Sequence, residues 1–473
     1  MKQQLNNIVL TSLVSLIWII TCIVSFIGFD GELGWVAITL FGLFTYASIM
    51  LWKTVFERRV APLELMFWLF HTNFLLLPAL SQSIHRSFYW SPYSEYQQES
   101  LLYASFLIVV GLIAFRIGAG LGQRGLKSIS SVNARMHTFC QPLETTWLPK
   151  IFLVTIIFGL VILISQLGIE FYTSSRTSKL GQVESLAEMG LLINLPQAIS
   201  LGVLLFSIVL LFHNWRDSRK LHFTTMVIIL AALGVNAIIN YPLSVARFWV
   251  FGFLISLMWT FSPLCHAVWR AAFAVSFTLM QFTVFPLYSQ ITRGKGAIGF
   301  DIDSIRQYLH HGDFDGFQSI VNISLYIQDN GFELGRNLIS AVLFFVPRAI
   351  WNKAEPLGTA AANHMGYIYT NLSAPIYGEF YADYGLLSLI LGMGIVGYGI
   401  RRYDIYYNNC ARTKRFGVGV LITGVLAGYL IILLRGSLLA VVPSIATLIG
   451  LLLIVGWLAK RTGKWSHIKF YHG

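Results

Sequence analysis

The feature that most constrains this chain is the recurrence of apolar runs of about 20 residues, each long enough to cross a hydrocarbon core of roughly 30 Å as a helix. The first three runs lie near 8–29, 33–52 and 61–81. Only 11% of the 473 residues are charged, against roughly 25% in a soluble domain. The sequence therefore predicts an all-α polytopic membrane protein.

About twelve membrane-spanning helices are expected from run length. Their predicted bounds are 8–29, 33–52, 61–81, 100–120, 149–169, 189–212, 222–240, 248–265, 268–288, 384–400, 416–434 and 438–459. The first run is too long for a signal peptide and is expected to be a retained span. The chain is thus predicted to be one integral membrane domain: nine spans in 1–288, a large loop in 289–383, and three spans with a cytoplasmic tail in 384–473.

The net charge of +12 is explained by the loops in which the basic residues fall. Alternate short loops hold most of the 33 lysines and arginines, whereas the loops on the other side are richer in acids. This is the positive-inside pattern, and it places both termini in the cytoplasm. The basic residues of these loops include Lys53, Arg58, Arg59, Arg124, Lys127, Arg135, Arg216, Arg219, Lys220, Arg401, Arg402, Arg412, Lys414, Arg415, Lys460 and Arg461. No nucleic-acid partner is implied, and none of the 4 cysteines falls in an outside loop.

The loop from about Ser289 to Asp383 is the only long segment that cannot span the membrane throughout. Within it, Asp313 and Asp315 are suited to begin an amphipathic helix that Asn330-Gly331 would end. The apolar positions have the spacing of one helix face. They are Phe317, Ile320, Val321, Ser324 and Leu325. Such a helix is expected to lie flat on the bilayer or on the ends of the spans.

The apolar segment 337–350 follows and is too short to cross a bilayer. We expect it to form a buried or re-entrant helix. Pro347 and Pro356 then bracket a turn that should bring Arg348 and Lys353 back to the surface.

Three arginines stand at the predicted outer ends of apolar segments that lie far apart in the sequence: Arg247, Arg348 and Arg435. A helix bundle could bring them to one outward cavity, where guanidinium groups bind phosphate oxygens in pairs of hydrogen bonds. This favours a site for a lipid-linked diphosphate. The alternative is that each arginine snorkels to the interface or binds a lipid headgroup.

Glu379 lies among aromatic residues just before a predicted span. A carboxylate in a partly dry site can have a raised pKa and act as a base; the alternative is a solvated interfacial acid. Asp383 is a weaker candidate on the same argument. His364 is the reserve base, with packing as its other reading, and His310 and His311 are expected to be exposed.

The Asp-x-Asp pairs Asp301/Asp303 and Asp313/Asp315 resemble the metal pairs of nucleotide-sugar glycosyltransferases. Those pairs belong to soluble folds, and these lie on the side of the membrane that lacks nucleotide sugars. Helix capping explains the second pair, so neither a metal nor another cofactor is predicted.

Several stretches of the large loop resemble the oligosaccharide repeat-unit polymerases, the O-antigen and capsule polymerases of the Wzy type. They are Gly312–Gln318, Gly335–Leu338, Leu343–Trp351 with Lys353 and Pro356, and Asn371–Gly385. The resemblance covers about 75 residues and extends more weakly to Pro242–Arg247 and Leu434–Ser437. Here Ala354-Glu355 separates Lys353 from Pro356.

The resemblance implies a helical fold of the GT-C-like kind in the bacterial inner membrane. It implies a glycosyltransferase that joins undecaprenyl-diphosphate-linked oligosaccharide units on the periplasmic face, with a chain-length regulator and a flippase as candidate partners besides membrane lipids. On this reading Glu379 is the base, and five cations bind substrate. They are Arg247, Arg348, Arg435, Arg336 and Lys353.

Three other functions remain open, and one of them is a membrane partner protein without catalytic activity. An O-antigen ligase of related architecture would transfer finished polymer to lipid A-core. A flippase or transporter would move the lipid-linked unit, although transporters tend to place charges near the membrane midplane.

Overall fold

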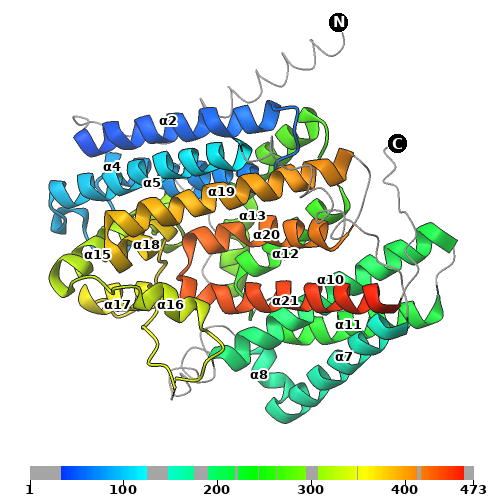
Figure 1. The fold of residues 1–473 in the computed structure, drawn as a ribbon. Helices are drawn as coiled ribbons and strands as arrows, with labels where there is room; N and C mark the ends of the chain where they lie inside the picture. Colours follow the sequence, from blue (N-terminus) through cyan, green and yellow to red (C-terminus); the bar gives the residue numbers. More distant parts are fainter. Residues whose placement is uncertain are drawn as a thin grey trace, which may run out of the picture. The chain divides into compact units, whose positions relative to one another are not determined.

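The structure is a computed structural model that describes residues 34–124, 147–174, 190–218, 222–242, 244–262, 264–293, 307–348, 350–412 and 417–462. All regular secondary structure in these ranges is helical (Figure 1). The all-α class predicted from the apolar runs is therefore confirmed. The predicted span at 8–29 and the pair Asp301/Asp303 lie outside the described residues.

The helices follow the apolar runs closely. They are α2 Trp35–Phe56, α3 Pro62–Phe70, α4 Leu77–Ile84, α5 Gln98–Arg124, α7 Trp147–Leu167, α8 Ile169–Thr173, α10 Gly190–Ser218, α11 Phe223–Ile239, α12 Arg247–Phe261, α13 Ala267–Arg293, α15 Gly316–Asn330, α16 Arg336–Val342, α17 Leu357–His364, α18 Ile376–Tyr384, α19 Leu386–Arg412, α20 Val418–Arg435 and α21 Leu438–Thr462. A π-helical stretch, His71–Leu76, joins α3 to α4 without a break.

Seven helices of the described residues are long and apolar enough to cross a membrane, so the chain is a multi-pass membrane protein. They are Trp35–Phe56, Pro62–Ile84, Gln98–Arg124, Leu148–Leu167, Ala267–Tyr288, Val418–Arg435 and Leu438–Leu458. Three further predicted spans form shorter apolar helices, Leu195–Leu211, Phe223–Ile239 and Arg247–Phe261. The predicted span at 384–400 begins two residues before α19 and otherwise matches the first part of that helix.

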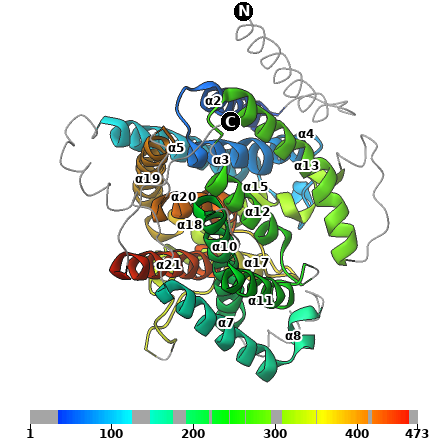
Figure 2. The same cartoon turned by 90° about the vertical axis from the view of Figure 1, so that its right-hand side faces the viewer.

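The chain forms two compact units. The first comprises Met1–Ser128, Leu264–Ile405 and Leu430–Val441, and the second comprises Ile129–Pro263, Tyr406–Tyr429 and Val442–Gly473. In the second unit α7, α10 and α11 pack side by side (Figure 2).

In the first unit, the continuous helix Pro62–Ile84 is buried throughout and packs against α2. The N–H groups of Leu63 and Glu64 at its start donate to the Asp404 carboxylate at 2.9 and 2.8 Å. The neighbouring α5 packs closely on α19, where a Cβ added at Gly118 or Gly397 would overlap the backbone of the other helix. Small residues thus permit the close helix approach that is common in membrane bundles.

The predicted amphipathic helix of the large loop is confirmed as α15, which packs against α5, α17 and α18. Its residues from Gly316 to Ser324 are all buried, so it is a core element rather than a helix lying on lipid. Gly331 ends it with φ +84°, as the Asn-Gly pair predicts. Asp315 stands at the N-cap but makes no side-chain capping bond.

The prediction of a buried or re-entrant helix over 337–350 is wrong. Only α16 is helical; turns follow from Leu343. Val342, Phe345 and Ile350 are 66%, 68% and 78% exposed. Pro347 lacks the N–H that a continuing helix would need. The run therefore forms a short helix and an exposed apolar turn.

Candidate functional site

Helix α18 is the element around which the candidate site is built. It begins after Pro375 and ends at Gly385, which has φ +64°, and every residue from Ile376 to Asp383 is buried. Its two carboxylates, Glu379 and Asp383, are both 0% exposed. Because a buried carboxylate needs partners within the protein, their hydrogen bonds define the site.

Glu379 bridges two segments that are distant in the sequence. Its Oε2 accepts a hydrogen bond from Asn337 Nδ2 at 2.5 Å, and its Oε1 accepts one from the backbone N–H of Leu438 at 3.0 Å. Burial raises the pKa of Glu379 to about 7, although these hydrogen bonds oppose the rise. A carboxylate with this pKa can hold or release a proton near neutral pH.

The hydrogen-bond partners of Asp383 are backbone N–H groups, which indicates a structural role. Its two oxygens accept the N–H groups of Asn337 and Leu338 at 3.1 and 3.0 Å, at the start of α16. Burial raises its pKa, and the two backbone hydrogen bonds lower it. Asp383 therefore holds α16 against α18 and leaves Glu379 as the better candidate for proton transfer.

Arg435, the last residue of α20, is ion-paired with Asp315 at 3.0 Å and also donates to the carbonyl of Gly312 at 3.2 Å. Asp315 further accepts hydrogen bonds from Ser373 Oγ at 2.6 Å and from Trp90 Nε1 at 3.1 Å. Since Leu438 follows Arg435 by three residues, the turn between α20 and α21 carries contacts to both Asp315 and Glu379. Arg435 and the N–H group that binds Glu379 thus belong to the same turn.

Three predicted cations gather at the start of α16 and in the turns that follow it. Lys353 Nζ donates to the carbonyl of Phe344 at 2.6 Å, and an Nη of Arg336 donates to the carbonyl of Lys353 at 3.4 Å. The prediction that Lys353 reaches the surface is wrong, because it is 6% exposed. Burial lowers its pKa, and the charge of Arg348 lowers it further.

Arg348 itself is exposed, and no carboxylate pairs with it in the described part of the chain. The nearest acid to Arg336 is Glu333, at 4.0 Å. The cationic segment, Arg336, Arg348 and Lys353, therefore keeps most of its positive charge uncompensated. Asn337 follows Arg336 in the sequence and donates to Glu379, so it connects the cationic segment to that carboxylate.

Two further candidates, His364 and Arg247, have other contacts. His364, at the end of α17, pairs with Asp329 at 3.1 Å and packs edge-on against Tyr326, so its contacts are with α15 rather than α18. Arg247 is the first residue of α12 in the second unit; it is 6% exposed and lies over the ring of Phe248.

His310 and His311 are half-buried rather than exposed. His311 pairs with Asp313 at 3.0 Å, whereas Asp315 pairs with Arg435. The two aspartates thus have separate partners. Among the described residues no group of three or more His, Cys, Asp or Glu side chains could hold a metal ion.

Sequence reasoning missed a network of neutral groups beside the site. Tyr96 OH donates to Asn322 Oδ1 at 2.8 Å and accepts from Gln318 Nε2 at 3.0 Å, and Tyr367 OH lies 2.8 Å away. Gln318 Oε1 in turn accepts the N–H of Trp90 at 3.3 Å. No charge or spacing marks such residues in a sequence. The polar positions of the otherwise buried α15 were the one available signal.

The described arrangement offers a proton acceptor, a paired arginine and an uncompensated cationic segment within the first unit. Comparison with family models, with curated proteins and with solved structures found no match to this chain.

Proposed function

We propose that the protein is a metal-independent glycosyltransferase of the bacterial inner membrane that polymerises oligosaccharide repeat units carried on undecaprenyl diphosphate. The reaction takes place on the periplasmic face, within a GT-C-like arrangement of about twelve spans. Both termini lie in the cytoplasm. A flippase would supply the units, and a chain-length regulator would act on the product.

The observation that carries this proposal is the cationic segment joined through Asn337 to Glu379. Arg336, Arg348 and Lys353 are held together, and among the described residues the one carboxylate that pairs with them is Glu333, 4.0 Å from Arg336. Like charges kept close together cost stability, and a diphosphate would relieve the repulsion. Guanidinium groups match the geometry of phosphate oxygens and remain charged at neutral pH.

In the proposed reaction, Glu379 takes the proton of an acceptor sugar hydroxyl. The oxygen then attacks the anomeric carbon of the growing chain, and the bond from that carbon to the diphosphate breaks. The cations stabilise the charge that develops on the departing undecaprenyl diphosphate. Arg435 would join them by exchanging Asp315 for a phosphate oxygen, and Arg247 is proposed as a further cation that binds the substrate.

Glu379 is fully buried, so the acceptor can reach it only when a neighbouring group moves. Asn337 and Leu438 supply its hydrogen bonds. Displacement of either by the substrate would expose the carboxylate. Because the carboxylate is buried until the substrate arrives, water has little access to the reacting groups, and hydrolysis of the donor would be limited.

The test is a strain that lacks the gene and is complemented with single variants. Arg348→Ala, Arg435→Ala, Arg247→Ala and Glu379→Gln are each expected to abolish the ladder of surface polysaccharide while the protein still inserts. Arg124→Ala, at the exposed end of α5, is the matched control and should restore the ladder. His364→Ala should also restore it if Glu379 is the base.

Normal ladders in all four site variants would overturn the proposal. The deletion strain itself separates the alternatives. Loss of a polymerase leaves single repeat units on core, whereas loss of a ligase leaves polymer on its lipid carrier. Uptake of lipid-linked oligosaccharide by proteoliposomes without polymerisation would indicate a transporter.

A further inference from the structure

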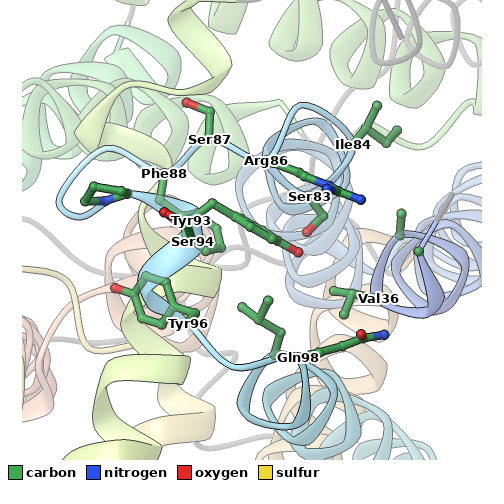
Figure 3. A pocket seen from close by; sticks show the side chains of 14 residues that line it. Val36, Ser83, Ile84, Arg86, Ser87, Phe88, Tyr93, Ser94, Tyr96 and Gln98 are labelled. Atoms are coloured by element: carbon green, nitrogen blue, oxygen red, sulfur yellow. The ribbon is translucent and has the colours of Figure 1, made fainter. Parts of the chain in front are cut away.

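A cavity of about 500 Å³ lies in the first unit, at the start of α2, the end of α4 and the start of α5 (Figure 3). Its wall is completed by the connection between α4 and α5, with Arg86, Phe88 and Tyr93. Ligand sites commonly have volumes of about 300–1,000 Å³. By the predicted topology, all three helix ends face the periplasm.

The cavity combines aromatic faces with hydrogen-bonding groups. The Tyr93 ring reaches toward Ser83 and Arg86. Burial raises the pKa of Tyr93, and the nearby Ser83 hydroxyl and Arg86 cation oppose the rise. Gln98 adds an amide to the same wall.

Arg86 supplies the charge of this wall. It is exposed, and no carboxylate pairs with it among the described residues. Ser83 is 7% exposed, and its hydroxyl interacts with the hydroxyl of Tyr93. The guanidinium group of Arg86 is therefore available to a polar occupant of the cavity.

Arg86 also has an unusual backbone. Its φ is +49°, one of two positive values at non-glycine residues of the described chain. Helices often end with glycine in this conformation because a side chain there is strained. The chain thus places an arginine, at a cost in stability, where glycine would fit without strain. Strain of this kind is concentrated at functional sites.

The cavity wall is continuous with the candidate site. Tyr96 lines the cavity and accepts a hydrogen bond from Gln318. Gln318 accepts from the N–H of Trp90, whose indole donates to Asp315, the partner of Arg435. A ligand in the cavity would therefore lie against the polar network that reaches Arg435.

We infer that this cavity is a saccharide subsite that holds one or two sugar residues of the oligosaccharide. This inference rests on the proposed function, because it assigns part of that substrate to the cavity. A pyranose ring presents C–H groups on its faces and hydroxyls around its edge. Tyr93 and Phe88 match the faces, and Ser83, Arg86 and Gln98 match the hydroxyls.

The test measures binding of the strain's own repeat-unit oligosaccharide, freed from its lipid diphosphate by mild acid, to the purified full chain in nanodiscs. Arg86→Gly and Tyr93→Ala are each expected to weaken binding about tenfold, the loss typical of one charged hydrogen bond or aromatic contact. Tyr403→Ala, an exposed tyrosine on α19, is the control and should bind as wild type does.

Arg86→Gly relieves backbone strain, whereas Arg86→Ala keeps it. Equal losses of affinity in the two variants would assign the effect to the side chain rather than to folding. Unchanged binding in Arg86→Gly and Tyr93→Ala, or no binding by the wild type, would overturn the inference. Binding of glycerol phosphate to the cavity without binding of the oligosaccharide would also overturn it, because that result indicates a site for a lipid headgroup.

This result is independent of the ladder test. If the ladder depends on Glu379 and Arg348 while the cavity variants bind normally, the proposed function stands and the subsite is wrong. If the oligosaccharide binds through Arg86 and Tyr93 but the Glu379 and Arg348 variants make normal ladders, the subsite stands and the proposed chemistry is wrong.

Discussion

The carboxylate of Glu379 accepts the backbone N–H of Leu438 at 3.0 Å, so an acid in the middle of α18 occupies the N-terminus of α21. The partial positive charge of a helix N-terminus favours the ionised acid, whereas complete burial disfavours it. The raised pKa shows that burial outweighs the favourable contacts. One buried acid thus both holds two helices together and titrates near neutral pH.

Glu379→Gln is expected to alter the pH dependence of stability. The folded protein binds this proton more tightly than the unfolded chain, because the pKa is about 7 against a reference of 4.5. The wild type should therefore lose stability as pH rises from about 4.5 to 7. The variant should lack this loss. Melting temperatures in detergent from pH 5 to 8 measure the difference, and parallel curves would contradict it.

Asn337 explains why the glutamine variant should still fold. Its Oδ1 is buried without a partner in the described part of the chain. Rotation of the amide would turn that oxygen toward the new Gln NH₂ group, while the Gln oxygen still accepts from Leu438. Glu379→Ala leaves the Leu438 N–H unpaired and leaves Asn337 Nδ2 with only the longer bond, 3.4 Å, to the carbonyl of residue 379. It should therefore be clearly less stable than Glu379→Gln.

Asp315 and Arg435 are expected to be coupled in stability. Asp315 is 2% exposed and pairs with Arg435 at 3.0 Å. Removing one partner of a buried pair costs about 3 kcal/mol because the other charge remains unpaired. Arg435→Gln should therefore be costly, and Asp315→Asn with Arg435→Gln should cost less than the sum of the single changes. Additive losses of unfolding free energy would contradict the coupling.

The apolar runs predicted where helices form, because run length and period depend on local sequence alone. Helix α15 was also predictable, from its spacing and from the Asn330-Gly331 end. The role of Asp315 was not. Local preference favoured an N-cap, but its observed partners are Trp90, Ser373 and Arg435, which only the tertiary fold brings together.

Lys353 and the run after α16 show a second limit of sequence reasoning. Hydropathy treats a lysine as a surface residue and an apolar run as buried. Here Lys353 is buried because the carbonyl of Phe344 accepts its ammonium group, while Phe345 is exposed. Such an exchange depends on a turn whose geometry hydropathy does not encode.

Arg348→Gln is expected to raise stability slightly while the polysaccharide ladder is lost. The positive charge of Arg348 lowers the pKa of Lys353, so the native cluster contains like-charge repulsion. Relief of that repulsion at an exposed side chain should be worth about 0.5 kcal/mol or less. Arg336→Gln is the control, since it also removes a contact with Glu333 at 4.0 Å. A fall in the melting temperature of Arg348→Gln would contradict the repulsion.

His71 and Tyr377 provide a test of how α18 is held. His71 Nδ1 lies 2.7 Å from the carbonyl of Phe67 and must donate to it, so the neutral ring accepts from Tyr377 OH through Nε2, at 2.6 Å. Both side chains are 0% exposed. Tyr377→Phe should therefore cost about 1–3 kcal/mol, because it leaves a buried acceptor unpaired. Adding His71→Phe removes that acceptor and should recover part of the loss. A melting temperature of Tyr377→Phe equal to that of the wild type would show that this hydrogen bond does not hold α18.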